Sequence, residues 1–239
     1  MSELSTSVQR GPIWPGVWRD YFRFIRNPRL YERAEPLGRA AFAGVGWLVL
    51  LILLMASILL GSFSAIEALG VHFPEPSIDI DSRLLQVLAI TLIPALEEVL
   101  FRGWLTGNRL AITAAAAAVL LIVLGPAAAR FGVWGVVALL ALWLALAGLI
   151  FSRPQQRVVE WLQPVFPAAF WTSTALFAGA HLMNYGIHAP PVAILLILPQ
   201  FIGGTILGYA RVRYGMWANI TIHASLNAAV VLVHTAFGI

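Results

Sequence analysis

The chain has 239 residues, of which 60% are hydrophobic and only 11% are charged. A soluble domain usually has about a quarter of its residues charged, so this composition excludes an ordinary water-soluble fold. The sequence has no Cys, which excludes disulfides, thiolate metal ligands and a cysteine nucleophile. Its positive net charge of +4 comes from arginines in the loops and the N-terminal tail, a pattern that does not indicate nucleic-acid binding.

Residues 1–39 form a basic tail, in which the stretch "WPGVWRDYFRFIR" places apolar side chains at helical spacing among arginines. Trp14, Trp18, Phe22 and Ile25 would share one face, which predicts an amphipathic helix lying on the membrane surface. A disordered basic tail is the alternative. The sequence thus divides into this tail, expected in the cytoplasm, and a transmembrane domain, residues 40–239.

Apolar runs of about 20 residues follow one another through the transmembrane domain, and each is long enough to cross a hydrocarbon core of about 30 Å. About seven spans are predicted: residues 40–66, 84–105, 110–129, 132–151, 166–185, 191–210 and 216–237. The predicted fold is therefore an all-α, polytopic helical membrane protein with an N-terminal amphipathic segment.

The placement of arginines predicts the orientation in the membrane. The N-terminal 39 residues hold seven arginines, and the segments that follow the second, fourth and sixth spans hold five more. The opposite loops have only Arg83 and Arg130. We therefore expect a multi-pass protein of the cell membrane, with its N-terminus in the cytoplasm and its C-terminus outside.

Few polar side chains interrupt the spans, and they are the candidate functional residues because ionisable groups are costly in a bilayer. The stretch "PALEEVLFRGWL" places two adjacent carboxylates in the second span. Glu98 and Arg102 are four residues apart and can pair along one helix. Glu97 is rotated by about 100° from Glu98 and has no local cation. We interpret Glu98 as a structural residue and Glu97 as the one available for chemistry.

Further polar residues in the spans complete three ordered motifs, Glu97-Glu98-x-x-x-Arg102, Phe177-x-x-x-His181 and His223-x-x-x-Asn227. Together they resemble the motifs of the CAAX protease and bacteriocin-processing (CPBP) family of intramembrane proteases, which includes the type II CAAX prenyl endopeptidases. The resemblance covers residues 84–227. It implies that the transmembrane domain is a protease domain.

The resemblance also implies a mechanism, a glutamate-dependent hydrolysis of a peptide bond. Glu97 would activate a water molecule as general base, and His181 would hold that water or share its proton. His223 and Asn227 would donate hydrogen bonds to the oxyanion of the tetrahedral intermediate, where such donors are commonly worth about 3–4 kcal/mol. Phe177 is expected to pack against His181, and Glu98 and Arg102 to support the site.

The family is also described as metalloproteases, so zinc is a possible cofactor, held by Glu97, His181 and His223. Metal-free activation of water is slightly favoured over zinc. The expected partners are the lipid bilayer and a membrane-tethered peptide or protein substrate. Whether that substrate is prenylated is not predicted, and neither is the oligomeric state.

Two other classes of function remain open, a proton-coupled transporter and a non-catalytic membrane scaffold, because intramembrane carboxylates and histidines also form proton relays. The absence of an internal repeat disfavours a transporter. Residue counting places His181 about 12 Å from Glu97 along the membrane normal, so the fifth span is predicted to extend past Tyr185. Glu97, His181, His223 and Asn227 are then expected to converge on one polar cavity that opens to the cytoplasm.

Overall fold

A computed structural model describes residues 16–31, 34–74, 82–185 and 192–237, and within them it contains helices and no strand. Trp14, at the start of the predicted amphipathic helix, lies outside these residues. Six helical segments have the length and apolar composition of membrane spans: Arg39–Ala68, Arg83–Thr106, Arg109–Ala129, Val133–Phe151, Ile194–Tyr214 and Met216–Phe237. The predicted all-α, polytopic membrane fold is confirmed.

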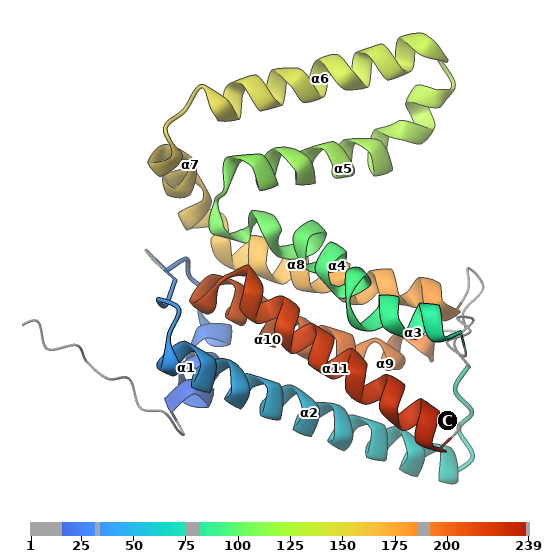
Figure 1. Ribbon diagram of the computed structural model, residues 1–239. Helices are drawn as coiled ribbons and strands as arrows, with labels where there is room; N and C mark the ends of the chain where they lie inside the picture. The colour runs from blue at the N-terminus through green and yellow to red at the C-terminus, as the bar shows by residue number, and fades with distance from the viewer. Residues whose placement is uncertain (1–15, 32–33, 75–81, 186–191, 238–239) are drawn as a thin grey trace, which may run out of the picture.

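Helix α10 (Leu198–Tyr214) lies at the centre of the bundle (Figure 1), and its residues from Gly203 to Ala210 are all buried. It packs against α2 (Arg39–Ala68), α8 (Phe166–Ala180) and α11 (Met216–Phe237). Gly208 permits the close approach of α8, because a Cβ atom there would lie only 2.7 Å from the Phe170 ring. Short α9 (Ala193–Leu196) precedes α10.

The predicted second span is broken into α3 (Arg83–Ile90) and α4 (Leu92–Arg102), which continues as the 3-10 turn η1 (Gly103–Thr106). Pro94 explains the break, because proline lacks an N–H group and its ring clashes with the carbonyl four residues earlier, here that of Ile90. Asn227 of α11 donates a 2.8 Å hydrogen bond to the carbonyl oxygen of Ala89 beside this break. The predicted second span is therefore not one straight helix, and Glu97 lies on its second part, α4.

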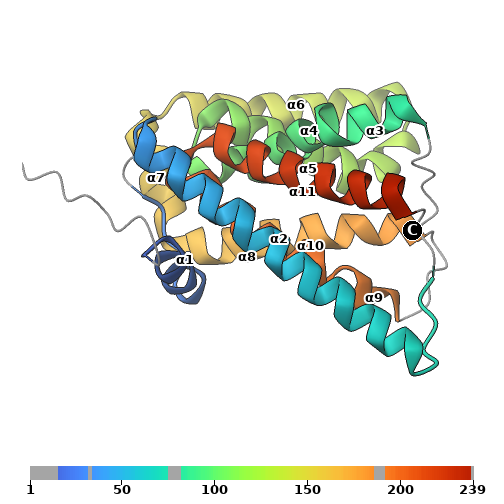
Figure 2. The ribbon, with the colours of Figure 1, turned by 60° about the horizontal axis from the view of Figure 1, so that its bottom comes forward.

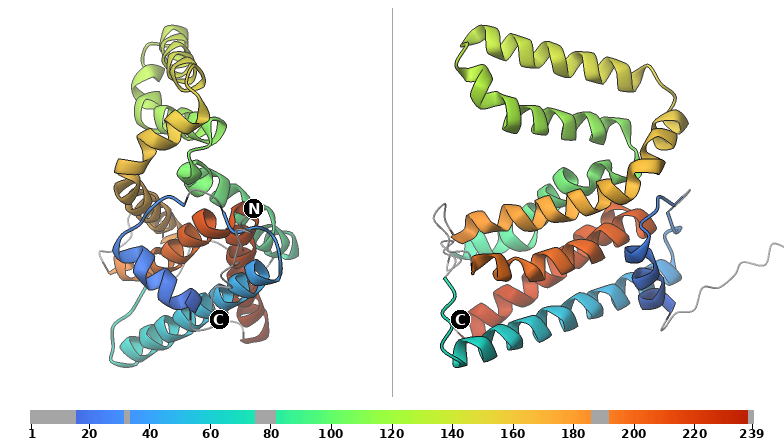
Figure 3. Two further views of the ribbon diagram at one scale, coloured as in Figure 1. Left: turned by 90° about the vertical axis from the view of Figure 1, so that its left-hand side faces the viewer. Right: turned by 180° about the vertical axis from the view of Figure 1, so that it is seen from behind.

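Helices α5 (Arg109–Ala129) and α6 (Val133–Phe151) form a hairpin that stands away from the rest of the bundle (Figures 1 and 3). The two helices pack closely at their turn, where a Cβ atom on Gly135 would overlap the carbonyl of Ala128. The chain returns to the bundle through α7 (Gln155–Leu162) and the turn η2 (Gln163–Val165). Arg109 secures the open end of the hairpin by donating to the carbonyl of Arg153 at 2.9 Å.

The N-terminal helix α1 (Gly16–Arg26) runs across the ends of the spans and packs beside α2, α8 and α10 (Figure 2). Its buried side chains are Tyr21 and Phe24, whereas Phe22 is 45% exposed. The predicted helix is present, and Phe22, on its predicted apolar face, stays open to the surroundings of the bundle. The other side of α1 is fixed to the bundle, because the Tyr21 hydroxyl bonds Thr205 at 2.6 Å and the Phe24 ring packs on Phe170 and Tyr209.

The arginines separate between the two ends of the bundle. The arginine-bearing α1 and α7, the start of α5 and the end of α10 lie together, on the left in Figure 1. Arg83 at the start of α3 and Arg130 at the end of α5 lie at the opposite end. The asymmetry that predicts orientation is therefore a property of the folded molecule, which has one arginine-rich end.

Candidate active site

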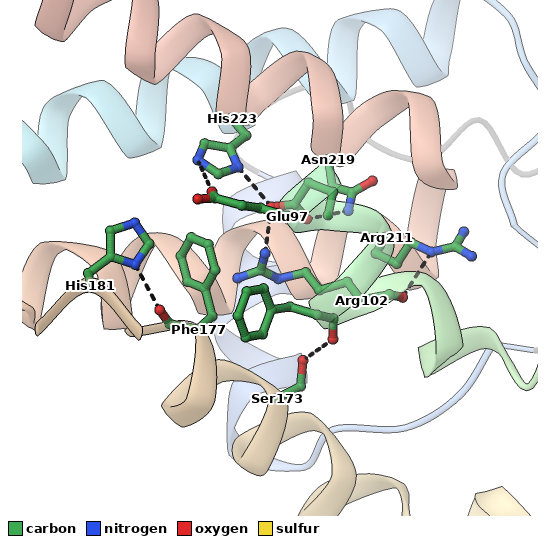
Figure 4. Close-up of polar contacts among 10 residues, drawn as sticks. Glu97, Arg102, Ser173, Phe177, His181, Arg211, Asn219 and His223 are labelled. Carbon is green, nitrogen blue, oxygen red and sulfur yellow. Dashed lines mark hydrogen bonds and ion pairs between the residues drawn. The ribbon is translucent and has the colours of Figure 1, made fainter. Parts of the chain in front are cut away.

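Glu98 is the centre of a buried hydrogen-bond network formed by α4 and α11. Figure 4 shows its partners Arg102, Asn219 and His223. Its carboxylate is fully buried and accepts hydrogen bonds from Arg102, Asn219 and His223. The pair with Arg102 is the one that the four-residue spacing predicts. Three donors on one carboxylate compensate the removal of its charge from water.

Glu97, by contrast, keeps 28% of its side chain exposed. Its Oε2 lies 3.5 Å from Nε2 of His223, while Nδ1 of the same ring lies 2.9 Å from Oε1 of Glu98. Because a carboxylate accepts, Nδ1 of His223 carries a hydrogen and Nε2 is the ring atom that faces Glu97. The two glutamates thus occupy opposite sides of one imidazole.

His181 approaches the network from the end of α8. Helix α8 ends at Ala180 and is followed by the 3-10 turn η3 (His181–Tyr185). The predicted extension of this span past Tyr185 falls on residues outside those described. The backbone N–H of His181 donates to the carbonyl of Ala178 and not to that of Phe177, four residues earlier. The Phe177 carbonyl oxygen is therefore free to accept a hydrogen bond from the His181 ring. Nδ1–H of His181 donates to that oxygen at 2.8 Å. A neutral ring therefore presents a lone pair at Nε2.

The Phe177 ring connects the two histidines. Its centre lies 4.7 Å from that of His181 and 5.6 Å from that of His223, edge to face in both cases. The guanidinium of Arg102 lies against the same ring (Figure 4). His181 consequently lies beside the network, even though residue counting along the spans places it far from Glu97.

Asn227 is placed differently from the other three motif residues. One of its amide hydrogens is donated to Ala89 at the break between α3 and α4. Two surface grooves, of about 440 Å³ and 310 Å³, are lined by residues other than Glu97, His181, His223 and Asn227. In this structure Glu97 contacts His223, His181 reaches them through Phe177, and Asn227 braces the helix break.

Comparison with known proteins decides the family. The family model for type II CAAX prenyl endopeptidases of the Rce1-like kind matches residues 80–229, which is more than half of the chain. The chain belongs to this family. Its members are intramembrane endopeptidases, so this Rce1-like protein is a multi-pass membrane protease. No curated protein and no solved structure matches the chain.

The described residues of this Rce1-like protein do not form a zinc site. Among them, no three His, Asp or Glu side chains are grouped closely enough to hold a metal ion. Nδ1 of His181 and Nδ1 of His223 are both engaged as donors, so Nε2 is the only nitrogen of each ring that could bind a metal. The predicted zinc ligands Glu97, His181 and His223 therefore do not form such a group in this structure.

Two residues that hold α4 in place were not among the sequence candidates. Arg211 of α10 donates to the carbonyls of Arg102 and Gly103, at 3.2 and 3.1 Å, and to the Thr106 hydroxyl at 3.0 Å. Ser173 of α8 donates to the carbonyl of Phe101. These bonds satisfy carbonyls at the end of a helix, which have no intrahelical partner. An arginine at the end of an apolar span was the available signal, but it served only to orient the chain.

Proposed function

We propose that this chain is a glutamate-dependent intramembrane endopeptidase in which Glu97 activates the attacking water. The observation that supports this assignment is the different burial of the two adjacent carboxylates. Glu98 is fully buried and accepts three hydrogen bonds, whereas Glu97 is 28% exposed and, among the described residues, has one polar contact, a ring nitrogen of His223 at 3.5 Å. A general base needs a free oxygen within reach of water, and Glu97 has one.

The proposed reaction begins when Glu97 removes a proton from water as the water oxygen attacks the carbonyl carbon of the scissile peptide bond. The carbonyl oxygen becomes the oxyanion of a tetrahedral intermediate. When this intermediate collapses, the C–N bond breaks and the proton passes from Glu97 to the leaving amine. The products are a carboxylic acid, which then ionises in water, and an amine, so one glutamate serves as base and then as acid.

His181 and His223 have separate roles in this proposal. Because Nδ1–H of His181 is bonded to the Phe177 carbonyl, the Nε2 lone pair of its neutral ring is left to accept a hydrogen bond from the water. His223 is held by Glu98 and directs Nε2 to the side on which Glu97 lies, where a proton on Nε2 would stabilise the oxyanion. The second amide hydrogen of Asn227 is the one that an oxyanion role requires.

We further propose that the substrate is a membrane-tethered peptide or protein that reaches Glu97 from the arginine-rich end of the bundle, which faces the cytoplasm. Arginines on the cytoplasmic side follow the rule that orients helical membrane proteins. The support is the clustering of the arginine-bearing helix ends on one side of the molecule.

The test is peptide cleavage by the purified protein in lipid vesicles, followed by mass spectrometry. Glu97→Gln keeps the size of the side chain and removes the base, so cleavage should fall by at least a factor of about 100. Glu67→Gln, at the end of α2, is the matched control and should cleave normally. Full cleavage by a folded Glu97→Gln protein would exclude Glu97 as the base.

A further inference from the structure

An apolar groove of about 310 Å³ lies between α1, α2, α8 and α10, and none of its lining residues belongs to the network around Glu98. Phe22 and Ile25 of α1 form one side, and Met55 of α2 forms another. Trp171 and Phe201 stack nearly parallel, with ring centres 6.0 Å apart and planes 14° apart, and make a flat wall. Ligand pockets begin at about this volume.

The groove offers nothing to a polar occupant. The hydroxyls of its two hydroxyl-bearing residues, Tyr21 and Thr205, are bonded to each other at 2.6 Å, and Thr205 also donates to the carbonyl of Ile202 at 2.7 Å. Water in this groove would lose hydrogen bonds and gain few. The groove therefore fits a hydrocarbon chain.

The depth of the groove matches a single leaflet. Helix α1 is fixed to α2 at Trp47, whose carbonyl accepts a 2.9 Å hydrogen bond from Nε1 of Trp18. Met55 lies eight residues further along α2, which is about 12 Å deeper at the rise of an α-helix. Half of a hydrocarbon core is about 15 Å thick. The groove thus runs from the level of α1 towards the middle of the membrane.

The polar side of α1 supplies positive charge at the mouth of the groove. Arg19 and Arg26 lie three residues before and four residues after Phe22, on the same side of the helix, and both are exposed. Asp20 is paired with the neighbouring Arg23, and among the described residues no carboxylate lies within ion-pair distance of Arg19 or Arg26. Two cations above an apolar groove complement an anionic headgroup above its acyl chain.

We propose that this groove binds one anionic phospholipid, with an acyl chain between α1, α2, α8 and α10 and its phosphate beside Arg19 and Arg26. The lipid belongs to the leaflet in which α1 lies. The site is separate from the proposed catalytic residues and does not depend on their assignment. It gives α1 a function that its packing on the bundle does not explain, because Phe22 remains exposed at the edge of the groove.

The test is native mass spectrometry of the full-length protein, purified in detergent and mixed with equal amounts of phosphatidylglycerol and phosphatidylcholine. The wild-type protein should retain one phosphatidylglycerol in preference to phosphatidylcholine. Arg19→Gln/Arg26→Gln should lower that preference about 30-fold, which corresponds to about 1 kcal/mol for each arginine. Arg130→Gln/Arg157→Gln removes the same charge elsewhere and should leave the preference unchanged.

Two variants that fill the groove, Met55→Trp and Ile202→Phe, should each reduce retention of the lipid. Leu60→Trp places the same ring on an exposed part of α2 outside the groove and is the control. Thermal unfolding in lipid-free detergent shows whether each variant folds. If one of the two fails to fold, lipid retention by the other tests the proposal. Equal retention of both lipids by the wild type, or normal retention by a folded filled variant, would overturn the proposal. So would a dimer that the filled variants abolish, because the groove would then be an interface between copies.

Discussion

The guanidinium carbon of Arg102 lies 4.0 Å from the centre of the Phe177 ring, in the interior of the bundle. Nη1 of Arg102 is bonded to Glu98, but Nε and Nη2 find no hydrogen-bond acceptor among the described residues. The face of the aromatic ring therefore takes the place of an acceptor for this buried cation. Gly204 makes the arrangement possible, since a Cβ atom there would lie 3.2 Å from Nη2.

Replacing Phe177 should consequently affect both stability and catalysis. Phe177→Leu keeps an apolar side chain but removes the ring between Arg102, His181 and His223. We expect a loss of about 2 kcal/mol in the free energy of unfolding, together with reduced cleavage because His181 loses its contact. Thermal unfolding and peptide cleavage measure the two effects. Phe131→Leu, at the exposed turn of the α5–α6 hairpin, should change neither.

The two adjacent glutamates should respond oppositely to substitution. Glu98→Ala leaves Arg102 buried without its carboxylate partner, so it should destabilise the protein by about 3–5 kcal/mol. Glu97→Ala removes a partly exposed carboxylate and should cost little stability while abolishing cleavage. Denaturant unfolding in mixed micelles compares the two variants. Equal losses of stability would show that the structural and catalytic roles are divided wrongly.

Arg211 should act on the reaction through α4. Arg211→Lys keeps the charge but cannot reproduce the three hydrogen bonds to Arg102, Gly103 and Thr106. With the end of α4 less firmly held, kcat should fall about tenfold with KM nearly unchanged, because misplacement of a catalytic group by about 1 Å is costly. Arg213→Lys is the control, since it can keep the ion pair with Glu35 at the surface. A rise in KM alone would instead place Arg211 at the substrate.

Asn227 has two possible contributions, and one variant separates them. Asn227→Ala deletes the hydrogen bond to Ala89 and should lower the free energy of unfolding by about 1 kcal/mol. If its second amide hydrogen also donates to the oxyanion, the same variant should in addition lower kcat by a factor of about 100 or more. A loss of stability with kcat unchanged would restrict Asn227 to the helix break.

The proposed orientation is open to a labelling experiment, because the chain has no native cysteine. Arg157→Cys is exposed at the arginine-rich end, and Arg130→Cys is exposed at the opposite end. In intact cells, an impermeant thiol reagent should label the second variant and not the first. The reverse pattern would place the N-terminus outside.

The sequence could predict contacts of the site that lie within one helix, but not those between helices. The Glu98–Arg102 pair follows from a spacing of four residues on one helix, and the structure contains it. The partners of Glu98 from α11 depend on how α4 and α11 pack, which no local rule supplies. Asn219 illustrates this: from the sequence it is one more polar residue on a helix, but in the fold it donates to the buried carboxylate.

The features that could not be predicted from the sequence depend on how helices pack against one another. The amphipathic spacing in α1 predicts the helix, but it cannot supply the bond between Tyr21 and Thr205 that fixes this helix to the bundle. The Phe177 ring contacts that bring His181 beside His223 depend on how α8 and α11 pack, which residue counting along separate spans cannot supply. The break at Thr91 had a visible cause in Pro94, although a continuous apolar run concealed it.

The separation of the α5–α6 hairpin from the bundle has a consequence for how this sequence tolerates change. Neither helix contributes a side chain to the hydrogen bonds around Glu98, and between them only Thr113 and Gly135 are buried. Under selection for peptide cleavage, most exchanges of one apolar residue for another in residues 114–151 should therefore be neutral, except at Gly135. Saturation mutagenesis should therefore find that residues 114–151 tolerate most apolar substitutions, whereas the flanking segments that hold Glu97 and His181 do not.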